Sequence, residues 1–243
     1  MRDTENTAKF IEAWLKEHVS KAKARGIIVG LSGGIDSAVV AALGRRAFGR
    51  ENILALIMPC HSDAQDAEDA LLAAKSLDID YKIINLDNAF DALAHEFLNN
   101  NLEISKLASA NLKARLRMSS LYAAAQTLNL LVCGTSNKSE YETGYFTKYG
   151  DSASDLWPIA DLLKTEVRAL AKYLNIPDKI IVKAPSAGLW ANQTDEGEMG
   201  FSYDQLDKYL LTGEAEPEIK IKIDAMRLNS EHKRRPVPIC KII

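Results

Sequence analysis

The sequence predicts an α/β fold, doubly wound, with a mainly parallel sheet and helices on both of its faces. Two observations predict it. Short continuous apolar runs alternate along the chain with longer segments of helical periodicity. A glycine-rich segment also joins the first apolar run to the helix that follows, which is where such sheets bind ligands.

The first half of the chain supplies this alternation. Thr4 is a candidate cap for a helix whose apolar stripe runs from Phe10 to Val19, and Gly26 ends the segment. Short apolar runs predict four buried strands, at 27–31, 53–58, 81–86 and 130–133. The periodicity between them predicts helices over 38–48, 63–77, 88–100 and 104–128.

Beyond Thr135 the pattern loosens, and we expect a long functional loop before a helix at 164–174. The stretch 183–200 combines Pro, Gly and acidic residues with little periodicity, which is typical of a mobile loop or lid. A helical and basic tail, about 203–243, contains expected helices at 203–211 and 218–228. The length of 243 residues favours a single domain over 1–243.

Composition narrows the function classes. Lys and Arg total 30 against 33 Asp and Glu, a formal charge of −3, so we expect no nucleic-acid partner. Cys60, Cys133 and Cys240 are far apart and form no CxxC pair, which favours free thiols in a reducing cytoplasm. The N-terminus is polar and no run approaches the roughly 18 apolar residues of a membrane helix. We therefore expect a cytoplasmic protein with no membrane partner.

The segment Leu-Ser-Gly-Gly-Ile-Asp-Ser at 31–37 carries the strongest chemical signal. Its glycines let backbone amides turn toward an anion, and the next helix points its positive N-terminus at the same place. Ser32 and Ser37 add hydroxyl donors, whereas Asp36 suits Mg²⁺ held against phosphates. A capped helix start would explain any one of these residues, but the whole string after a buried strand indicates phosphate binding.

Two other phosphate-binding motifs are excluded. The nearest match to a Walker loop, at 44–50, has Arg where Lys is required and no strand before it. The dinucleotide fingerprint GxGxxG is absent. The string Ser-Gly-Gly-Ile-Asp-Ser is instead the signature loop of the N-type ATP pyrophosphatases, which this chain resembles. That resemblance implies an adenine-nucleotide α-hydrolase-like fold and cleavage of ATP between its α and β phosphates.

Further strings narrow the resemblance to one family. They lie at 111–118, 134–140, 144–151, 155–159, 164–166, 183–187, 193–196 and 231–234. Among them, Lys-Tyr-Gly-Asp at 148–151 and His-Lys at 232–233 are the most specific. In these strings the chain is similar to the ammonia-dependent NAD⁺ synthetases over nearly its whole length. The resemblance implies amidation of deamido-NAD⁺ by ammonia through an adenylated intermediate, giving NAD⁺, AMP and pyrophosphate.

The resemblance also assigns residues by position. Its ATP-binding positions fall on Gly30, Leu31, Ser32, Gly33, Gly34, Ile35, Asp36, Ser37, Thr135, Lys164 and Ser186, the last where many members carry Thr. Those for deamido-NAD⁺ fall on Arg115, Lys148, Asp155, His232 and Lys233. Asp36 and Glu140 match the Mg²⁺ ligands. Asp151 is a candidate acceptor of the proton of ammonium, and a homodimer with the dinucleotide near its interface is implied.

Alternatives remain at this point. Glutamine-using relatives carry an extra amidase domain, for which this chain is too short, so the expected nitrogen source is free ammonia or ammonia delivered by a separate protein. A tRNA thiolase would commonly need paired cysteines and a basic RNA surface, and a GMP-synthetase-like amidation is the other rival within the superfamily. A non-catalytic nucleotide-binding regulator would predict erosion of Asp36, Glu140 or Lys164, yet all three are present.

Overall fold

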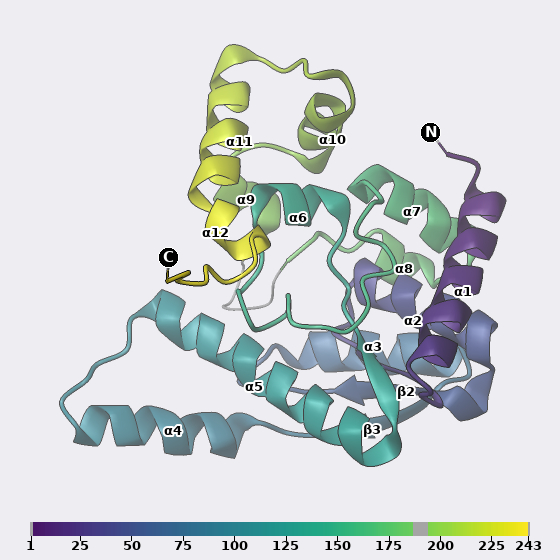
Figure 1. The fold of residues 1–243 in the computed structure, drawn as a ribbon, viewed down its shortest axis with the longest axis horizontal. Coiled ribbons are helices and arrows are strands. Elements are labelled where there is room, and N and C mark those ends of the chain that lie inside the picture. Colours follow the sequence, from purple (N-terminus) through teal and green to yellow (C-terminus); the bar gives the residue numbers. More distant parts are fainter. Residues whose placement is uncertain (1, 187–193, 243) are drawn as a thin grey trace.

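The computed structural model describes residues 2–186 and 194–242. In this part of the chain four strands form one parallel sheet, in the order β3-β2-β1-β4 (Figure 1). The strands are β1 (Gly26–Gly30), β2 (Ile53–Ile57), β3 (Asp80–Ile83) and β4 (Leu130–Cys133). The predicted parallel sheet is confirmed. Because β2 and β4 flank β1 on opposite sides, the winding reverses at β1 and leaves a crevice at the carboxyl ends of β1 and β4.

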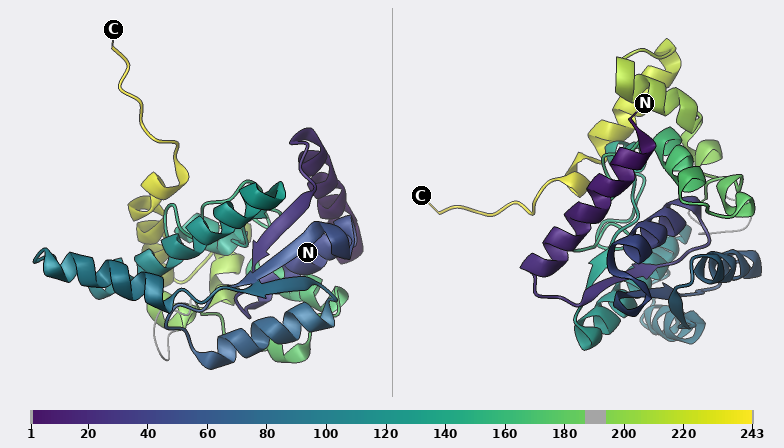
Figure 2. Two further views of the ribbon diagram at one scale, coloured as in Figure 1. Left: turned by 90° about the horizontal axis from the view of Figure 1, so that it is seen from below. Right: turned by 90° about the vertical axis from the view of Figure 1, so that its right-hand side faces the viewer.

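Helices cover both faces of the sheet, as predicted (Figures 1 and 2). One face packs against α1 (Thr4–Lys21), α2 (Ile35–Phe48), α3 (Ala64–Ser76), α7 (Lys164–Tyr173) and α8 (Asp178–Ile181). The other packs against α5 (Lys106–Leu128), beside which lies α4 (Asp87–Asn99). A short 3-10 helix, η1 (Arg50–Asn52), precedes β2. Since α2 contacts the sheet, α1 and α7, it is apolar nearly all round rather than amphipathic.

The remaining helices gather beside the crevice. They are α6 (Lys138–Thr143), α9 (Asp195–Met199), α10 (Tyr203–Thr212), α11 (Pro217–Asn229) and α12 (Glu231–Arg234). Met199, Phe201, Tyr203, Leu206 and Ile223 form a small apolar cluster of their own there. In Figure 1 these helices stand above the sheet, with α10 and α11 at the top and α6 below them. The C-terminal helices α10 and α11 thus pack on α6 and α7.

Several predicted boundaries are wrong, for local reasons. The cap of α1 is Asp3, whose carboxylate accepts a hydrogen bond from the Asn6 amide at 2.7 Å, and not Thr4, which is helical. Gly26 opens β1 rather than ending the preceding helix. The expected loop beyond Thr135 contains α6, because Asn137 caps it.

The predicted lid at 183–200 contains α9 and includes 187–193, which lie outside the described residues. Among the described residues, every helix is too short or too polar to span a bilayer.

Packing of α1 on α2 and α7 yields a stability prediction. Leu15 is fully buried in the main core, whereas Phe10 on the same helix is 72% exposed. Leu15→Ala should lower the free energy of unfolding by about 2–5 kcal/mol, since it leaves a cavity. Phe10→Ala should change it by less than about 0.5 kcal/mol. Urea titration followed by circular dichroism measures both; equal losses would contradict the position of α1.

Candidate active site

The loop between β1 and α2 is shaped by its own side chains. The hydroxyl of Ser37 accepts a hydrogen bond from the Ser32 amide at 3.2 Å and donates to the Gly34 carbonyl at 2.9 Å. Gly34 is the N-cap of α2 and makes no side-chain cap bond. The first amides of α2 therefore have no capping side chain and can bind an anion.

Gly33 is required by this turn. Its φ is +80°, and a Cβ there would lie 2.4 Å from the carbonyl oxygen of Asp66 on α3. No side chain fits between the loop and α3, so Gly33 brings the two backbones into close contact.

A cavity of ≈ 580 Å³ opens at the carboxyl ends of β1 and β4. Most of the predicted ATP-binding residues lie on its wall: Gly30, Leu31, Ser32, Gly34, Ile35, Asp36, Ser37, Thr135, Lys164 and Ser186. Glu140, Asp151 and Lys233 also line it. Residues that are far apart in the sequence therefore share one cavity, as the predicted nucleotide site requires.

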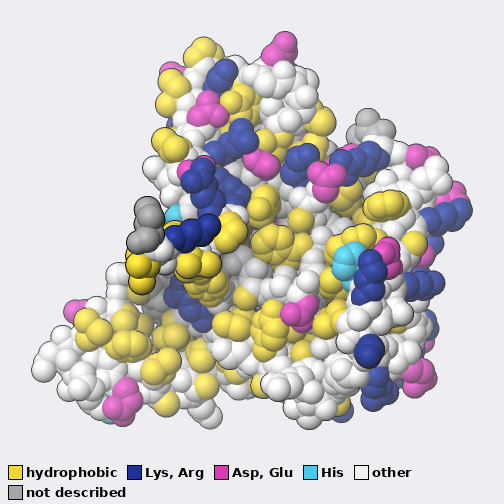
Figure 3. Space-filling model, in the orientation of Figure 1, with side chains coloured by type: hydrophobic (Ala, Val, Ile, Leu, Met, Phe, Trp, Pro, Cys, Tyr) yellow, Lys and Arg dark blue, Asp and Glu magenta, His cyan; other side chains and the backbone are white. Residues whose placement is uncertain are grey.

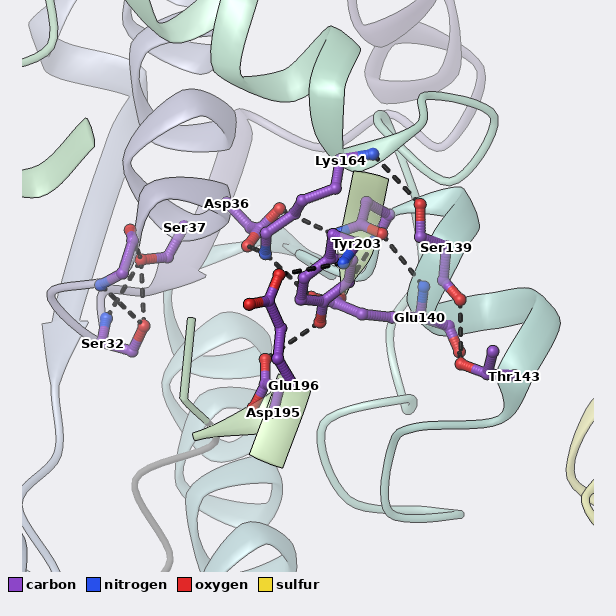
Figure 4. A network of polar contacts seen from close by, with 12 residues as sticks. Ser32, Asp36, Ser37, Ser139, Glu140, Thr143, Lys164, Asp195, Glu196 and Tyr203 are labelled. Carbon is purple, nitrogen blue, oxygen red and sulfur yellow. Dashed lines mark hydrogen bonds and ion pairs between the residues drawn. The ribbon is translucent and has the colours of Figure 1, made fainter. Parts of the chain in front are cut away.

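A buried lysine forms the charged centre of the cavity (Figure 4). Lys164 is only 2% exposed, and its Nζ lies 2.5 Å from Oδ2 of Asp36 and 3.2 Å from Oε1 of Glu140. Asn137 donates from Nδ2 to the other oxygen of Asp36 at 2.9 Å. One cation thus contacts carboxylates that come from α2 and α6.

Helix capping holds these groups in place. Asn137 and Glu140 form a capping box: each side chain accepts a hydrogen bond from the backbone amide of the other, at 3.0 and 3.2 Å. The hydroxyl of Ser139 accepts from the Lys164 amide at 3.1 Å and donates to Asp207 at 2.5 Å. The N-termini of α6 and α7 are therefore fixed side by side.

The electrostatics of the centre follow from its burial. Burial raises the pKa of Glu140 above its usual range, although the nearby Lys164 ammonium opposes the shift. Burial alone would lower the pKa of Lys164, but the carboxylates of Asp36 and Glu140 outweigh it and raise that pKa. Lys164 therefore carries its charge at neutral pH and neutralises the site.

Four predicted dinucleotide residues lie near one another, and among them Lys233 lines the cavity. Arg115 donates from Nη2 to the Lys148 carbonyl at 3.2 Å, and Lys148 donates from Nζ to the His232 carbonyl at 2.7 Å. Lys233 donates to the carbonyls of residues 144 and 146, at 2.8 Å each. These contacts join α5, the loop after α6 and α12 into one basic cluster.

Asp155 does not join that cluster. Its carboxylate accepts from the Val132 amide at 2.8 Å and from the hydroxyl of Tyr122 at 3.3 Å, so it fixes the end of β4. Burial, reinforced by Asp155, raises the pKa of Tyr122 to about 12. Asp151 lies on the cavity wall, and its Oδ1 accepts from the Thr147 amide at 2.9 Å.

Sequence reasoning gave no role to Asn137, Arg117, Asp195 or Tyr203. The spacing Asn-x-x-Glu at 137–140 is a capping-box signal that identifies Asn137. Arg117 lines the cavity and donates to the Met58 carbonyl at 3.0 Å; burial lowers its pKa. Asp195 lies in the string at 193–196, but no local pattern gives a role to it or to Tyr203, because their contacts depend on tertiary packing.

The tight turn at Gly33 can be tested by unfolding. Gly49 has a similar φ of +73°, but nothing lies within 4 Å of a Cβ placed there. Its ψ is 175°, a region almost restricted to glycine, so Gly49→Ala should lower the free energy of unfolding by about 1–3 kcal/mol through backbone strain alone. Gly33→Ala should lower the free energy of unfolding through the same kind of backbone strain and by about 1–3 kcal/mol more, because the new side chain is overpacked against α3. Urea titrations of both variants compare them, and equal losses would contradict the close approach to Asp66.

Comparisons with known proteins agree with this geometry. A family model described as NAD synthase matches residues 7–237. The NH(3)-dependent NAD(+) synthetase of Carboxydothermus hydrogenoformans is 52% identical over 95% of both chains, and that of Syntrophomonas wolfei is 46% identical over 98% of this chain and 96% of its own.

Solved structures show the same likeness over the whole fold. An NMN synthetase from Francisella tularensis superposes with a TM-score of 0.94 at 36% identity, over 100% of both chains. An NH3-dependent NAD synthetase from Campylobacter jejuni has a TM-score of 0.83 at 34% identity, over 99% of this chain and 100% of its own. The chain belongs to the NAD synthase family.

Proposed function

We propose that this chain uses ATP and ammonia to convert the nicotinate carboxylate of deamido-NAD⁺ into the amide of NAD⁺, with release of AMP and pyrophosphate. One observation carries the proposal: the Lys164 ammonium lies between the carboxylates of Asp36 and Glu140, beside the uncapped N-terminus of α2. Relatives that cover 95% or more of this chain are named NH(3)-dependent NAD(+) synthetases.

The reaction needs charge neutralisation more than a protein nucleophile. A carboxylate is a poor acyl donor, because its oxygen leaves poorly until AMP is attached to it. The loop amides and the N-terminus of α2 bind the phosphates of ATP, with Thr135, Lys164 and Ser186 beside them. Positioning of the two anions lets the nicotinate oxygen attack the α phosphate, and pyrophosphate leaves. Ammonia then displaces AMP from the acyl-adenylate.

Asp36 and Glu140 are suited to hold Mg²⁺. Their carboxylates come from different helices, yet both contact one Nζ, and carboxylate oxygens are the ligands that Mg²⁺ prefers. When bound, the ion supplies further positive charge to the phosphates. Lys164 is the positive charge that the protein itself supplies next to these carboxylates.

The basic cluster is suited to the dinucleotide. Arg115, Lys148, His232 and Lys233 hold it, since a pyrophosphate needs cations from more than one side. Asp155 contributes to dinucleotide binding indirectly, because its carboxylate fixes the end of β4. Asp151 accepts the proton of ammonium, and its carboxylate on the cavity wall supports this role.

A second candidate function is supported by one observation. The chain superposes on the Francisella tularensis NMN synthetase with a TM-score of 0.94, above the 0.83 of the Campylobacter jejuni NAD synthetase. The same site would then amidate the nicotinate of a mononucleotide instead of a dinucleotide. Both candidates share the chemistry at Asp36, Glu140 and Lys164 and differ in the acceptor.

An assay of the purified protein tests the activity. ATP, Mg²⁺, ammonium chloride and deamido-NAD⁺ should yield NAD⁺ and AMP in equal amounts, measured by enzymatic reduction and chromatography. Asp36→Asn and Glu140→Gln should each lower turnover by about 10²-fold or more, as expected when charge stabilisation is removed. Omission of Mg²⁺ should stop the reaction.

The controls are Asp161→Asn and a second acceptor. Asp161 is an exposed acidic residue paired with Arg2 and Lys138, away from the cavity wall, so turnover should not change. Nicotinate mononucleotide replaces deamido-NAD⁺ in a parallel assay, and a higher kcat/KM for it would favour the second candidate. If ATP binds but neither acceptor is amidated, the proposal fails.

We also propose that the protein forms a homodimer through α4 and α5. No residue of α4 is buried, and α5 buries only Ala110, Ala114 and Ala125 among its residues. Exposed apolar side chains occupy this surface, namely Leu93, Leu98, Leu102 and Leu107. Hydrophobic side chains gather over these helices in Figure 3. Such a surface favours association, and Arg115 on α5 would place the dinucleotide near the interface.

Light scattering after size exclusion tests the dimer. Leu98→Glu puts a charge on the apolar surface and should shift the protein to the mass of one chain. Ile221→Glu is the matched control, since Ile221 on α11 is 69% exposed against 63% for Leu98. A wild-type protein that elutes with the mass of one chain would contradict the proposal.

A further inference from the structure

The Lys164 ammonium lies near an aromatic ring, in addition to the two carboxylates that it contacts (Figure 4). The Nζ atom lies 4.8 Å from the centroid of the Tyr203 ring. Tyr203 is fully buried, with 0% of its surface exposed. The ring lies within cation–π distance of an ammonium that is almost completely shielded from water, where such an interaction is strongest.

This ring limits where the ammonium can go. Lysine has a flexible four-carbon stem, so the attraction of Asp36 and Glu140 alone does not fix its conformation. The Tyr203 ring lies against the ammonium, and its electron-rich face attracts the charge. The ammonium is thereby kept at the position where it lines the cavity.

Tyr203 is itself held firmly. Its hydroxyl donates to Oδ2 of Asp195 at 2.9 Å, and its amide donates to Oε1 of Glu196 at 2.9 Å, both on α9. On the next turn of α10, Asp207 accepts from the hydroxyl of Ser139 at 2.5 Å and from the Thr165 amide at 2.8 Å. One face of α10 therefore contacts α6, α7 and α9 together.

We propose that Tyr203 is a positioning residue for Lys164: its ring holds the ammonium in the orientation that meets a phosphate of the bound nucleotide. The residue touches no substrate and acts through Lys164. The inference rests on the proposed function in one respect, namely that Lys164 acts on ATP.

The chain offers a matched control on the same helix. Tyr209 also donates its hydroxyl to an aspartate, Asp224, at 2.7 Å, and its ring also lies near a lysine, with the Nζ of Lys220 5.9 Å from the centroid. It does not line the cavity. Tyr209→Leu thus removes the same kinds of contact as Tyr203→Leu, but away from the catalytic lysine.

Steady-state kinetics separate the two positions. Tyr203→Leu should lower kcat by about tenfold or more while KM for deamido-NAD⁺ changes by less than about twofold, because Lys164 acts on ATP and not on the dinucleotide. Tyr203→Phe keeps the ring and should recover most of kcat. Tyr209→Leu should leave both constants within about twofold of the wild type.

A double-mutant cycle identifies the route of action. The affinity for ATP with Mg²⁺ is measured by calorimetry for Tyr203→Leu, for Lys164→Ala and for the double variant. If the ring acts through Lys164, Tyr203→Leu should weaken binding in the wild-type background and change nothing once Lys164 is gone. Equal losses in both backgrounds would overturn the proposal, because they would indicate a general packing role.

Three outcomes must be distinguished: a variant that does not fold, a wild type without the proposed activity, and an active enzyme in which Tyr203 has no positioning role. Circular dichroism and thermal unfolding check each variant, and Tyr203→Met, whose longer unbranched side chain adapts to irregular space, replaces Tyr203→Leu if that variant does not fold. If the wild type forms no amidated product, the proposed function fails whatever the variants do. If the wild type is active and Tyr203→Leu behaves like Tyr209→Leu, only the positioning role is lost.

Discussion

The structure of the site depends on one buried charge. An ammonium removed from water is costly unless other groups compensate it, and Lys164 is compensated by Asp36, Glu140 and the ring of Tyr203. These partners lie on three different helices, α2, α6 and α10, and Lys164 itself lies on a fourth, α7. The carboxylates also need the lysine, because each of them would otherwise be buried without a counter-charge. The packing of α2, α6, α7 and α10 is therefore coupled to the electrostatics of the cavity.

Much of the fold follows from local rules. The apolar runs of β1 and β4 gave their positions to within a residue, because a strand buried on both faces leaves a clear signal. The phosphate loop was recognisable for a similar reason: Gly33 and Gly34 occur where the backbone must turn sharply. Short helices such as α6 and α9 were not predicted, because a single cap and tertiary contacts decide them rather than periodicity.

The site was predictable in parts. Motifs indicated Asp36, Glu140 and Lys164 as individual residues, and their contact within one centre is a result of the three-dimensional structure. Tyr203 and Asp207 lie in an ordinary amphipathic helix, and nothing in its pattern distinguishes them from residues of a core. Asp155 shows the opposite case, since its motif is specific while its carboxylate is used by the backbone of β4.

The late position of α10 and α12 in the sequence has a consequence for biosynthesis. The loop at 30–37 and Lys164 leave the ribosome well before Tyr203, Asp207 and Lys233 do. Until those residues arrive, the ammonium lacks its ring, Ser139 lacks its acceptor and the loop after α6 lacks the lysine that binds its carbonyls. A nascent chain can build the sheet early, but it acquires an ordered catalytic centre only when synthesis is nearly complete. Incomplete chains therefore have no assembled centre with which to consume ATP.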